Sequence, residues 1–153
     1  MRIGYGEDAH RLAPGRPLIL GGVRVPSPVG PIAHSDGDAL LHALTDALLS
    51  AVAAGDIGAL FPNDDPKNRD RPSREFVAAA LARVHARGYR PMEVRGVVVL
   101  DAPKLGPHRP AIEAALAELL GLAAEGVGLT FKTSEGLAPH HVQARVFVRL
   151  DRL

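Results

Sequence analysis

The segment from His141 to Leu150 alternates strictly between two kinds of side chain, and no other stretch limits the possible folds as much. One set is apolar and consists of Val142, Ala144, Val146, Val148 and Leu150. The other set is mostly polar and consists of His141, Gln143, Arg145, Phe147 and Arg149. Successive side chains of a β-strand point to opposite faces, so the pattern predicts a strand with one face in a core. That face has to be covered by a second layer of secondary structure.

The rest of the chain supplies the elements for two layers. Apolar residues at helical spacing predict helices over 38–54, 73–87 and 107–120. Apolar runs predict strands over 2–12, 94–100 and 127–133, and a hairpin over 18–25 around two glycines. Loops are expected over the proline-rich residues 26–31 and over 55–72. We expect an α/β fold of the α+β type in a single domain, 1–153: a two-layer sandwich with a mixed four-stranded sheet, helices on one face and a small N-terminal hairpin.

Charge and residue usage exclude several classes of protein. With 18 basic and 17 acidic residues the formal net charge is +1, which argues against a general nucleic-acid binder. The chain has no cysteine, so disulfides and cysteine-ligated zinc are excluded. The N-terminal residues lack the apolar core of a signal peptide, and no apolar run is long enough to cross a bilayer. We therefore expect a cytoplasmic protein with no membrane partner.

One aspartate and two histidines are suited to hold a metal ion. Asp8 and His10 are two residues apart on a predicted strand and therefore share a face, whereas His42 lies on the polar stripe of the first predicted helix. Three nitrogen and oxygen ligands leave a fourth tetrahedral position open, which is typical of catalytic zinc. Asp38 and Asp46, one turn either side of His42, are placed to hold the far nitrogen of a ligating histidine. A chance D-x-H pair and a surface histidine are the alternative interpretation.

Two further polar stretches are suited to bind phosphate. Residues 34–38 precede the first predicted helix, and a helix N-terminus attracts anions through its free N–H groups and its dipole. Residues 132–136 follow a predicted strand and offer an ammonium, two hydroxyls and a carboxylate, a set that suits a phosphate with a hard divalent ion. A capped loop and a surface turn explain the same residues, and composition does not decide between the two interpretations.

The chain resembles the 2-C-methyl-D-erythritol 2,4-cyclodiphosphate synthase family, which acts in the non-mevalonate route to isoprenoid precursors. The resemblance runs in order along nearly the whole chain. It rests on the following stretches: Arg2-Ile3-Gly4-Tyr5-Gly6-Glu7-Asp8-Ala9-His10, Gly21-Gly22-Val23-Arg24-Val25-Pro26, Ala33-His34-Ser35-Asp36-Gly37-Asp38, His42-Ala43-Leu44-Thr45-Asp46-Ala47-Leu48-Leu49, Gly55-Asp56-Ile57-Gly58, Phe61-Pro62, Ala102-Pro103-Lys104 and Pro107-His108. The combination of D-x-H, HSDGD and GDIG in this spacing is specific to that family.

The resemblance implies a role for each matched residue. It implies zinc, or another divalent transition metal, at Asp8, His10 and His42, and a second divalent ion, Mg²⁺ or Mn²⁺, with the substrate phosphates. It implies catalytic roles for His34, Thr133 and Glu135. The implied substrate contacts are Asp8, His10, His34, Ser35, Asp56, Gly58, Phe61, Asp65, Leu100, Pro103, Lys104, Leu105, Gly106, Lys132, Thr133, Ser134 and Glu135.

By the same resemblance the activity is that of a metal-dependent, CMP-releasing, cyclising phosphorus–oxygen lyase. Its cytidine-diphosphate-linked substrate is 4-diphosphocytidyl-2-C-methyl-D-erythritol 2-phosphate, and the enzyme is a homotrimer with active sites between subunits. Two features depart from the family: Asn63 stands where an acid is usual, and the altered residues 137–144 place Val142 at the family's arginine for diphosphate on the trimer axis. The residues alone leave two alternatives open, a metal-dependent phosphoesterase and a non-catalytic trimeric module that binds a metabolite.

Overall fold

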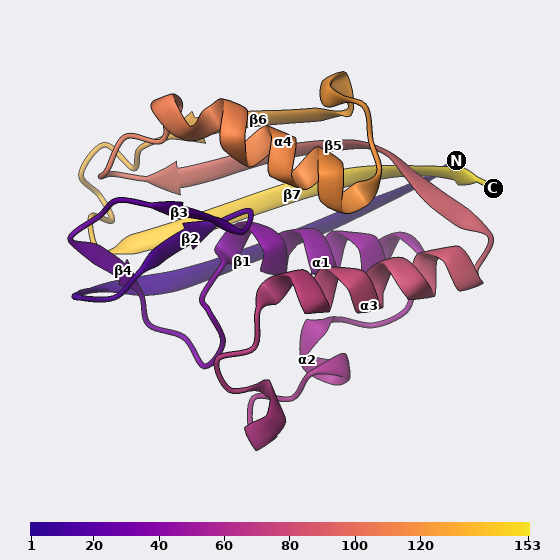
Figure 1. Cartoon of the computed structure of the whole chain (residues 1–153), viewed down its shortest axis with the longest axis horizontal. Coiled ribbons are helices and arrows are strands. Elements are labelled where there is room, and N and C mark those ends of the chain that lie inside the picture. The colour runs from indigo at the N-terminus through magenta and orange to yellow at the C-terminus, as the bar shows by residue number, and fades with distance from the viewer.

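The computed structural model describes residues 1–153 and has two layers (Figure 1). One layer is a five-stranded mixed sheet in the order β4-β1-β7-β5-β6. Its strands are β1 (Arg2–Pro14), β4 (Val29–Pro31), β5 (Tyr89–Leu100), β6 (Val127–Lys132) and β7 (His141–Arg152). The other layer lies against one face of the sheet and consists of α1 (Ala39–Ala51), α3 (Ser73–Ala86) and α4 (Arg109–Leu120). The α/β sandwich that the sequence predicts is thus confirmed.

Short elements complete the chain. The predicted hairpin is present as β2 (Leu18–Leu20) and β3 (Val23–Val25). The long loop after α1 contains the single-turn helix α2 (Ile57–Leu60) and a 3₁₀ turn, η1 (Pro66–Asn68). Two further 3₁₀ turns, η2 (Gly106–His108) and η3 (Ala124–Gly126), flank α4. None of the helices combines the length and the apolar character that crossing a membrane would require.

Strand β7 has the two-faced character that its alternation predicts. Its five apolar residues, from Val142 to Leu150, are all buried beneath α1 and its neighbours. Arg145 and Phe147 point to the opposite face and are exposed. On that face the side chains of Ile3, Tyr5 and Phe147 are 62%, 40% and 52% exposed, and the rings of Tyr5 and Phe147 are in contact. The single chain therefore leaves an apolar area of the sheet uncovered.

The sheet has one more strand than expected. Residues 29–31 pair in antiparallel fashion with the end of β1, where the three prolines predict only a loop. Proline is tolerated in this strand because it is an edge strand, in which one row of N–H groups needs no partner. The pairing also explains why β1 continues to Pro14, two residues beyond the predicted end of the strand at residue 12.

Helix α1 and strand β1 approach each other closely because two glycines of β1 face the helix. A Cβ atom added to Gly6 would lie 2.2 Å from the carbonyl oxygen of Ala43, and one added to Gly4 would lie 1.9 Å from that of Ala47. No side chain fits in so small a space. The close approach places His42, the residue before Ala43, beside the strand that carries Asp8.

Asp38 is the N-cap residue of α1. The Asp38 carboxylate is fully buried and accepts hydrogen bonds from the N–H groups of Leu41, Gly21 and Gly22. It therefore joins the start of α1 to the turn of the β2–β3 hairpin. Burial raises the pKa of Asp38 from 3.8 to about 6, although the three N–H donors oppose the shift.

The raised pKa of Asp38 predicts a pH-dependent contribution to stability. Between about pH 4 and pH 6 the folded state binds a proton at Asp38 that the unfolded chain has released, so the free energy of unfolding falls as the pH rises through this range. The expected loss is about 3 kcal/mol. Urea unfolding of metal-free wild type and Asp38→Asn measures the difference between their free energies of unfolding. This difference should shrink by the same amount between about pH 4 and pH 7. A difference that stays constant or grows with pH would contradict the shift.

Candidate metal centre and adjoining pockets

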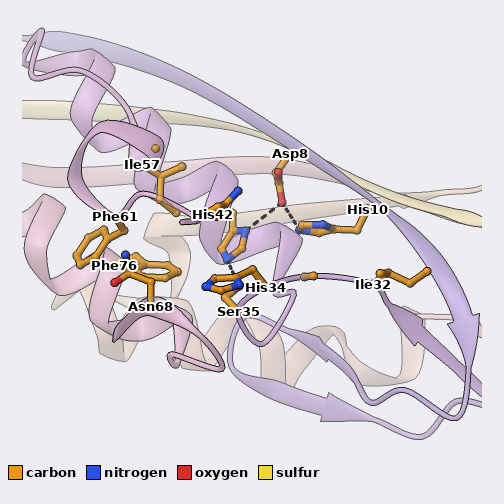
Figure 2. Close-up of a pocket in the computed structure, with 13 residues that line it drawn as sticks. Asp8, His10, Ile32, His34, Ser35, His42, Ile57, Phe61, Asn68 and Phe76 are labelled. Atoms are coloured by element: carbon orange, nitrogen blue, oxygen red, sulfur yellow. Dashed lines mark hydrogen bonds and ion pairs between the residues drawn. The ribbon is translucent and has the colours of Figure 1, made fainter. Parts of the chain in front are cut away.

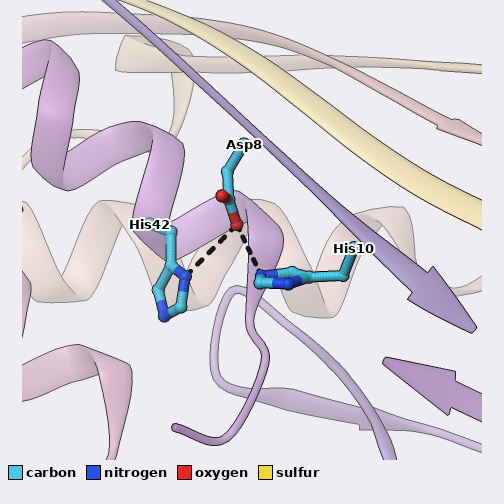
Figure 3. A group of neighbouring side chains, drawn as sticks. All are labelled: Asp8, His10 and His42. Atoms are coloured by element: carbon cyan, nitrogen blue, oxygen red, sulfur yellow. Dashed lines mark hydrogen bonds and ion pairs between the residues drawn. The ribbon is translucent and has the colours of Figure 1, made fainter. Parts of the chain in front are cut away.

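Asp8, His10 and His42 converge on one point between β1 and α1 (Figure 3). The Nε2 atom of His10 lies 2.6 Å from Oδ2 of Asp8, and Nδ1 of His42 lies 3.2 Å from the same oxygen. One ligand atom from each residue lies within 4.8 Å of the other two. The predicted convergence of these three residues is confirmed, and the group can hold a metal ion.

The electrostatics of the three residues fit a cation. Burial opposes the charge of the Asp8 carboxylate, but the two imidazoles beside it outweigh this effect and lower the pKa of Asp8. Burial likewise opposes the charge of His42, and the neighbouring Asp8 carboxylate outweighs it and raises the pKa of His42. Nε2 of His10 is buried and, despite its short distance to Asp8, is not aligned for a hydrogen bond. Two nitrogens and an anionic oxygen directed at one point are the donor set of a three-ligand metal site.

The candidate metal centre forms one wall of a pocket of about 310 Å³ (Figure 2). Besides the three ligands, the side chains labelled around it are Ile32, His34, Ser35, Ile57, Phe61, Asn68 and Phe76. Gly58 and Asn63 also line the pocket. The ring of His34 has a buried Nε2 atom with no partner in the protein, which leaves that atom for a ligand. The pocket thus combines a cation site with polar groups suited to an anion.

Two predicted contacts with the substrate lie outside this lining. The carboxylate of Asp56 caps α2 by accepting a hydrogen bond from the backbone N–H of Ala59. The carboxylate of Asp65 caps η1 by accepting a hydrogen bond from the backbone N–H of Lys67. Both carboxylates therefore shape the loop that carries Gly58 and Phe61. Asp46 on α1 accepts a hydrogen bond from the N–H of Ile57 and ties the same loop to the helix that carries His42.

A second group of predicted contacts lines a separate pocket of about 310 Å³ at the carboxyl ends of β5 and β6. Its lining includes Leu100, Lys104, Leu105, Gly106, Lys132 and Thr133. Three further lining residues, Asp101, Arg109 and Phe131, were not among the predicted contacts. The metal-centre pocket and this second pocket share no residue. Pro103, Ser134 and Glu135 belong to the adjoining loops without lining either pocket.

Asp101 joins the two loops of the second pocket. Its Oδ1 atom accepts hydrogen bonds from both the N–H (2.6 Å) and the hydroxyl (2.7 Å) of Ser134. The Ser134 oxygen in turn accepts from the N–H of Ala138, so its hydroxyl group is engaged within the protein. Thr133 differs, because its Oγ1 accepts from the N–H of Glu135 and keeps its own proton for another partner. An acid directly after a buried strand was the available sequence signal for Asp101.

The partner of the far nitrogen of His42, Nε2, differs from the prediction. Neither Asp38 nor Asp46 contacts it, because their carboxylates accept backbone hydrogen bonds from other segments. Nε2 of His42 instead lies 3.1 Å from the hydroxyl oxygen of Ser35. Helical spacing places Asp38 and Asp46 one turn from His42 but does not show that their side chains are already in use.

Comparisons with known proteins agree with this geometry. A model described as the YgbB family matches residues 1–150. A Thermus thermophilus protein named 2-C-methyl-D-erythritol 2,4-cyclodiphosphate synthase is 63% identical over 151 residues, which cover 99% of each chain. A Deinococcus radiodurans protein of the same name is 61% identical over 153 residues, covering 99% of this chain and 95% of that protein.

Solved structures show the same relationship. A structure named 2C-methyl-D-erythritol-2,4-cyclodiphosphate synthase superposes with a TM-score of 0.95 at 61% identity, covering 98% of this chain and 100% of that chain. A second structure of that name, described as the bound form with CDP, gives a TM-score of 0.94 at 59% identity with the same coverage. With a family match over almost the whole sequence and relatives this similar in both sequence and structure, the chain belongs to the YgbB family.

Proposed function

We propose that this chain is a 2-C-methyl-D-erythritol 2,4-cyclodiphosphate synthase, a lyase of the non-mevalonate pathway. The observation that carries the proposal is the convergence of Asp8, His10 and His42 at the wall of a polar pocket. The relatives of this name, at 61–63% identity over nearly the full length, support it. We infer further that residues 1–153 act as one catalytic domain, since a single cluster of 33 buried residues runs through both layers. A cytoplasmic location stays a prediction.

The proposed reaction is an intramolecular phosphoryl transfer in 4-diphosphocytidyl-2-C-methyl-D-erythritol 2-phosphate. An oxygen of the 2-phosphate forms a bond to the β-phosphorus of the diphosphate. The bond from that phosphorus to the bridging oxygen breaks, and CMP leaves with the electron pair. A phosphate monoester is already largely ionised near neutral pH, because its second pKa is about 6. The pocket therefore needs no general base, and its task is to orient two anionic groups against their mutual repulsion.

The side chains of the two pockets are suited to that task. When bound, a divalent cation at Asp8, His10 and His42 supplies positive charge to the phosphate oxygens. His34 offers its unpartnered Nε2 to the same anions. In the second pocket Thr133 keeps a free hydroxyl proton, and Lys104 and Lys132 carry positive charge beside it. Hydrogen-bond donors fixed in advance stabilise the charge that develops on transferring phosphoryl oxygens.

The identity of the metals is part of the proposal. A set of two imidazoles and one carboxylate suits Zn²⁺, which takes three protein ligands and keeps one open position in catalytic sites. A second ion that contacts mainly phosphate oxygens and one carboxylate suits Mg²⁺ or Mn²⁺. Glu135 is the proposed carboxylate, since its side chain is exposed at the rim of the second pocket's loop.

We further propose a homotrimer in which the metal-centre pocket of one subunit faces the second pocket of its neighbour. One substrate molecule has to reach the residues of both pockets, yet the two pockets share no residue within a chain. The sheet face that carries Ile3, Tyr5 and Phe147 is apolar and uncovered, as an interface between identical subunits would be. The cytidine end of the substrate would then occupy the pocket at 100–106, and the solved structure described as bound to CDP supports a nucleotide ligand.

Phosphorus NMR of the products tests the proposed function. The protein is incubated with the diphosphocytidyl substrate, Zn²⁺ and Mg²⁺, and we expect a cyclic diphosphate and CMP in equal amounts. An open-chain phosphate would instead indicate a metal-dependent phosphoesterase in which water attacks. Binding of the nucleotide without release of CMP would indicate a non-catalytic module. Protein stripped of metal by a chelator is the control and should give no product.

A further inference from the structure

We propose that Ser35 is a positioning residue of the metal centre. Its hydroxyl oxygen accepts the Nε2 proton of His42, which leaves the Nδ1 lone pair for the cation, and its own proton remains for a substrate phosphate. This inference rests on the proposed function only in assuming that Asp8, His10 and His42 bind a metal. It assigns to Ser35 a second task besides the substrate contact that the family resemblance implies.

The two ring nitrogens of His42 face different partners (Figure 2). Nδ1 points toward Asp8, at 3.2 Å from Oδ2, on the side where His10 also lies. Nε2 points toward Ser35, at 3.1 Å from Oγ. His42 is nearly buried, with 9% of the residue exposed, and its ring packs against the ring of Phe76 at 5.6 Å between centroids. A half-turn of the imidazole about its Cβ–Cγ bond would put carbon atoms in the places of both nitrogens, so the ring would lose both polar contacts.

The direction of the hydrogen bond between Ser35 and His42 follows from the chemistry of the ring. A neutral imidazole carries one proton, and the nitrogen that binds a metal must be the one without it. Nδ1 shares its side of the ring with Asp8 and His10, so the cation binds there and the proton belongs to Nε2. Nε2–H then donates to the Ser35 oxygen. Partners of this kind fix the tautomer of metal-binding histidines and raise the affinity for the metal.

The loop around Ser35 holds its hydroxyl oxygen in place as an acceptor. The N–H of Gly37 lies 3.3 Å from the Ser35 oxygen and donates to it. Asp36 anchors the loop to α3, because its carboxylate accepts hydrogen bonds from the N–H and the hydroxyl of Ser73. It also accepts from the N–H of Asp38. The loop is therefore fixed at both the helix that carries His42 and the helix that carries Phe76.

Two acceptor positions and one donor position are available on a serine hydroxyl. In the metal-bound form the N–H of Gly37 and Nε2–H of His42 occupy both acceptor positions of Ser35. The hydroxyl proton is left without an internal partner, and Ser35 lines the pocket beside the candidate metal centre. Ser35 can therefore form a hydrogen bond with a ligand in the pocket only as the donor. An anionic phosphate oxygen is a suitable acceptor for such a bond.

Metal affinity in the absence of substrate is the first test. Zn²⁺ is titrated into metal-free wild type, Ser35→Ala and Ser35→Thr against a competing chelator. We expect Ser35→Ala to bind Zn²⁺ roughly 10- to 100-fold more weakly, and Ser35→Thr, which keeps the hydroxyl, to bind within about threefold of the wild type. Ser27→Ala is the matched control, because the Ser27 hydroxyl donates to the carbonyl oxygen of Val29 and Ser27 lines neither pocket. Its affinity should equal that of the wild type.

Equal affinity of Ser35→Ala and wild type overturns the positioning role and leaves the proposed function intact. If the wild type itself binds no Zn²⁺, or binds it as well after His42→Ala, the metal centre and both proposals fail together. The second test needs no variant. A long-range ¹H–¹⁵N spectrum of the zinc-loaded wild type should show the His42 proton on Nε2, and a proton on Nδ1 would refute the inference even if Ser35→Ala failed to fold.

Discussion

Replacing His42 by alanine is expected to remove the tightly bound metal and to lower the rate of CMP release by roughly three orders of magnitude or more. His42 is one of only three proposed protein ligands, and Asp8 and His10 alone would form a weak site on one strand. Because charge neutralisation is the main contribution of a cation to phosphoryl transfer, binding and rate should fall together. Metal analysis after dialysis and phosphorus NMR of the products measure the two effects.

The same variant should remain folded. Alanine suits the interior of a helix at least as well as histidine, which offsets part of the loss of the contact between His42 and Asp8. We expect the circular dichroism spectrum to be unchanged and the free energy of unfolding of the metal-free protein to change by less than about 2 kcal/mol. His85→Ala, an exposed position of α3, is the matched control for loss of a histidine and should keep metal and activity. Full zinc occupancy in His42→Ala would refute the ligand assignment.

Gly6→Ala is expected to destabilise the fold by about 3 kcal/mol or more. The new methyl group would lie 2.2 Å from the carbonyl oxygen of Ala43 and 2.5 Å from the backbone nitrogen of Ala47. Both atoms belong to the backbone of α1, so the whole helix has to move away from β1 and no side chain can turn aside. Such a shift also separates His42 from Asp8, and zinc affinity should fall along with stability. Urea unfolding of the metal-free protein measures the first effect.

A matched glycine separates this clash from the general effect of adding a methyl group. A Cβ atom on Gly106 would meet no heavy atom within 4 Å, and its backbone does not require positive φ. Gly106→Ala should therefore change the free energy of unfolding by less than about 1 kcal/mol. If Gly6→Ala proved as stable as Gly106→Ala, the close contact between β1 and α1 would be wrong, and so would the reason given for the position of His42.

Local patterns in the sequence were sufficient to predict the two layers and the three candidate metal ligands. The alternation of β7 and the spacing of leucines in α1 each depend on a single element, because the period of a strand or helix decides which side chains share a face. The pair Asp8 and His10 is local in the same sense. That His42 joins them was predicted, and the glycines at positions 4 and 6 explain it, although their role is visible only once α1 lies on β1.

Only the tertiary structure decided which residues that are far apart in the chain form hydrogen bonds with each other. The far nitrogen of His42 meets Ser35, while Asp38 and Asp46 are occupied by the hairpin turn and by α2. The edge strand β4 and the hydrogen bonds from Ser134 to Asp101 likewise depend on segments brought together by folding. The physical reason is that a polar side chain bonds to whichever donor or acceptor packing brings within about 3 Å. Spacing along the chain determines the face on which a residue lies, and the packing of distant segments determines what it contacts there.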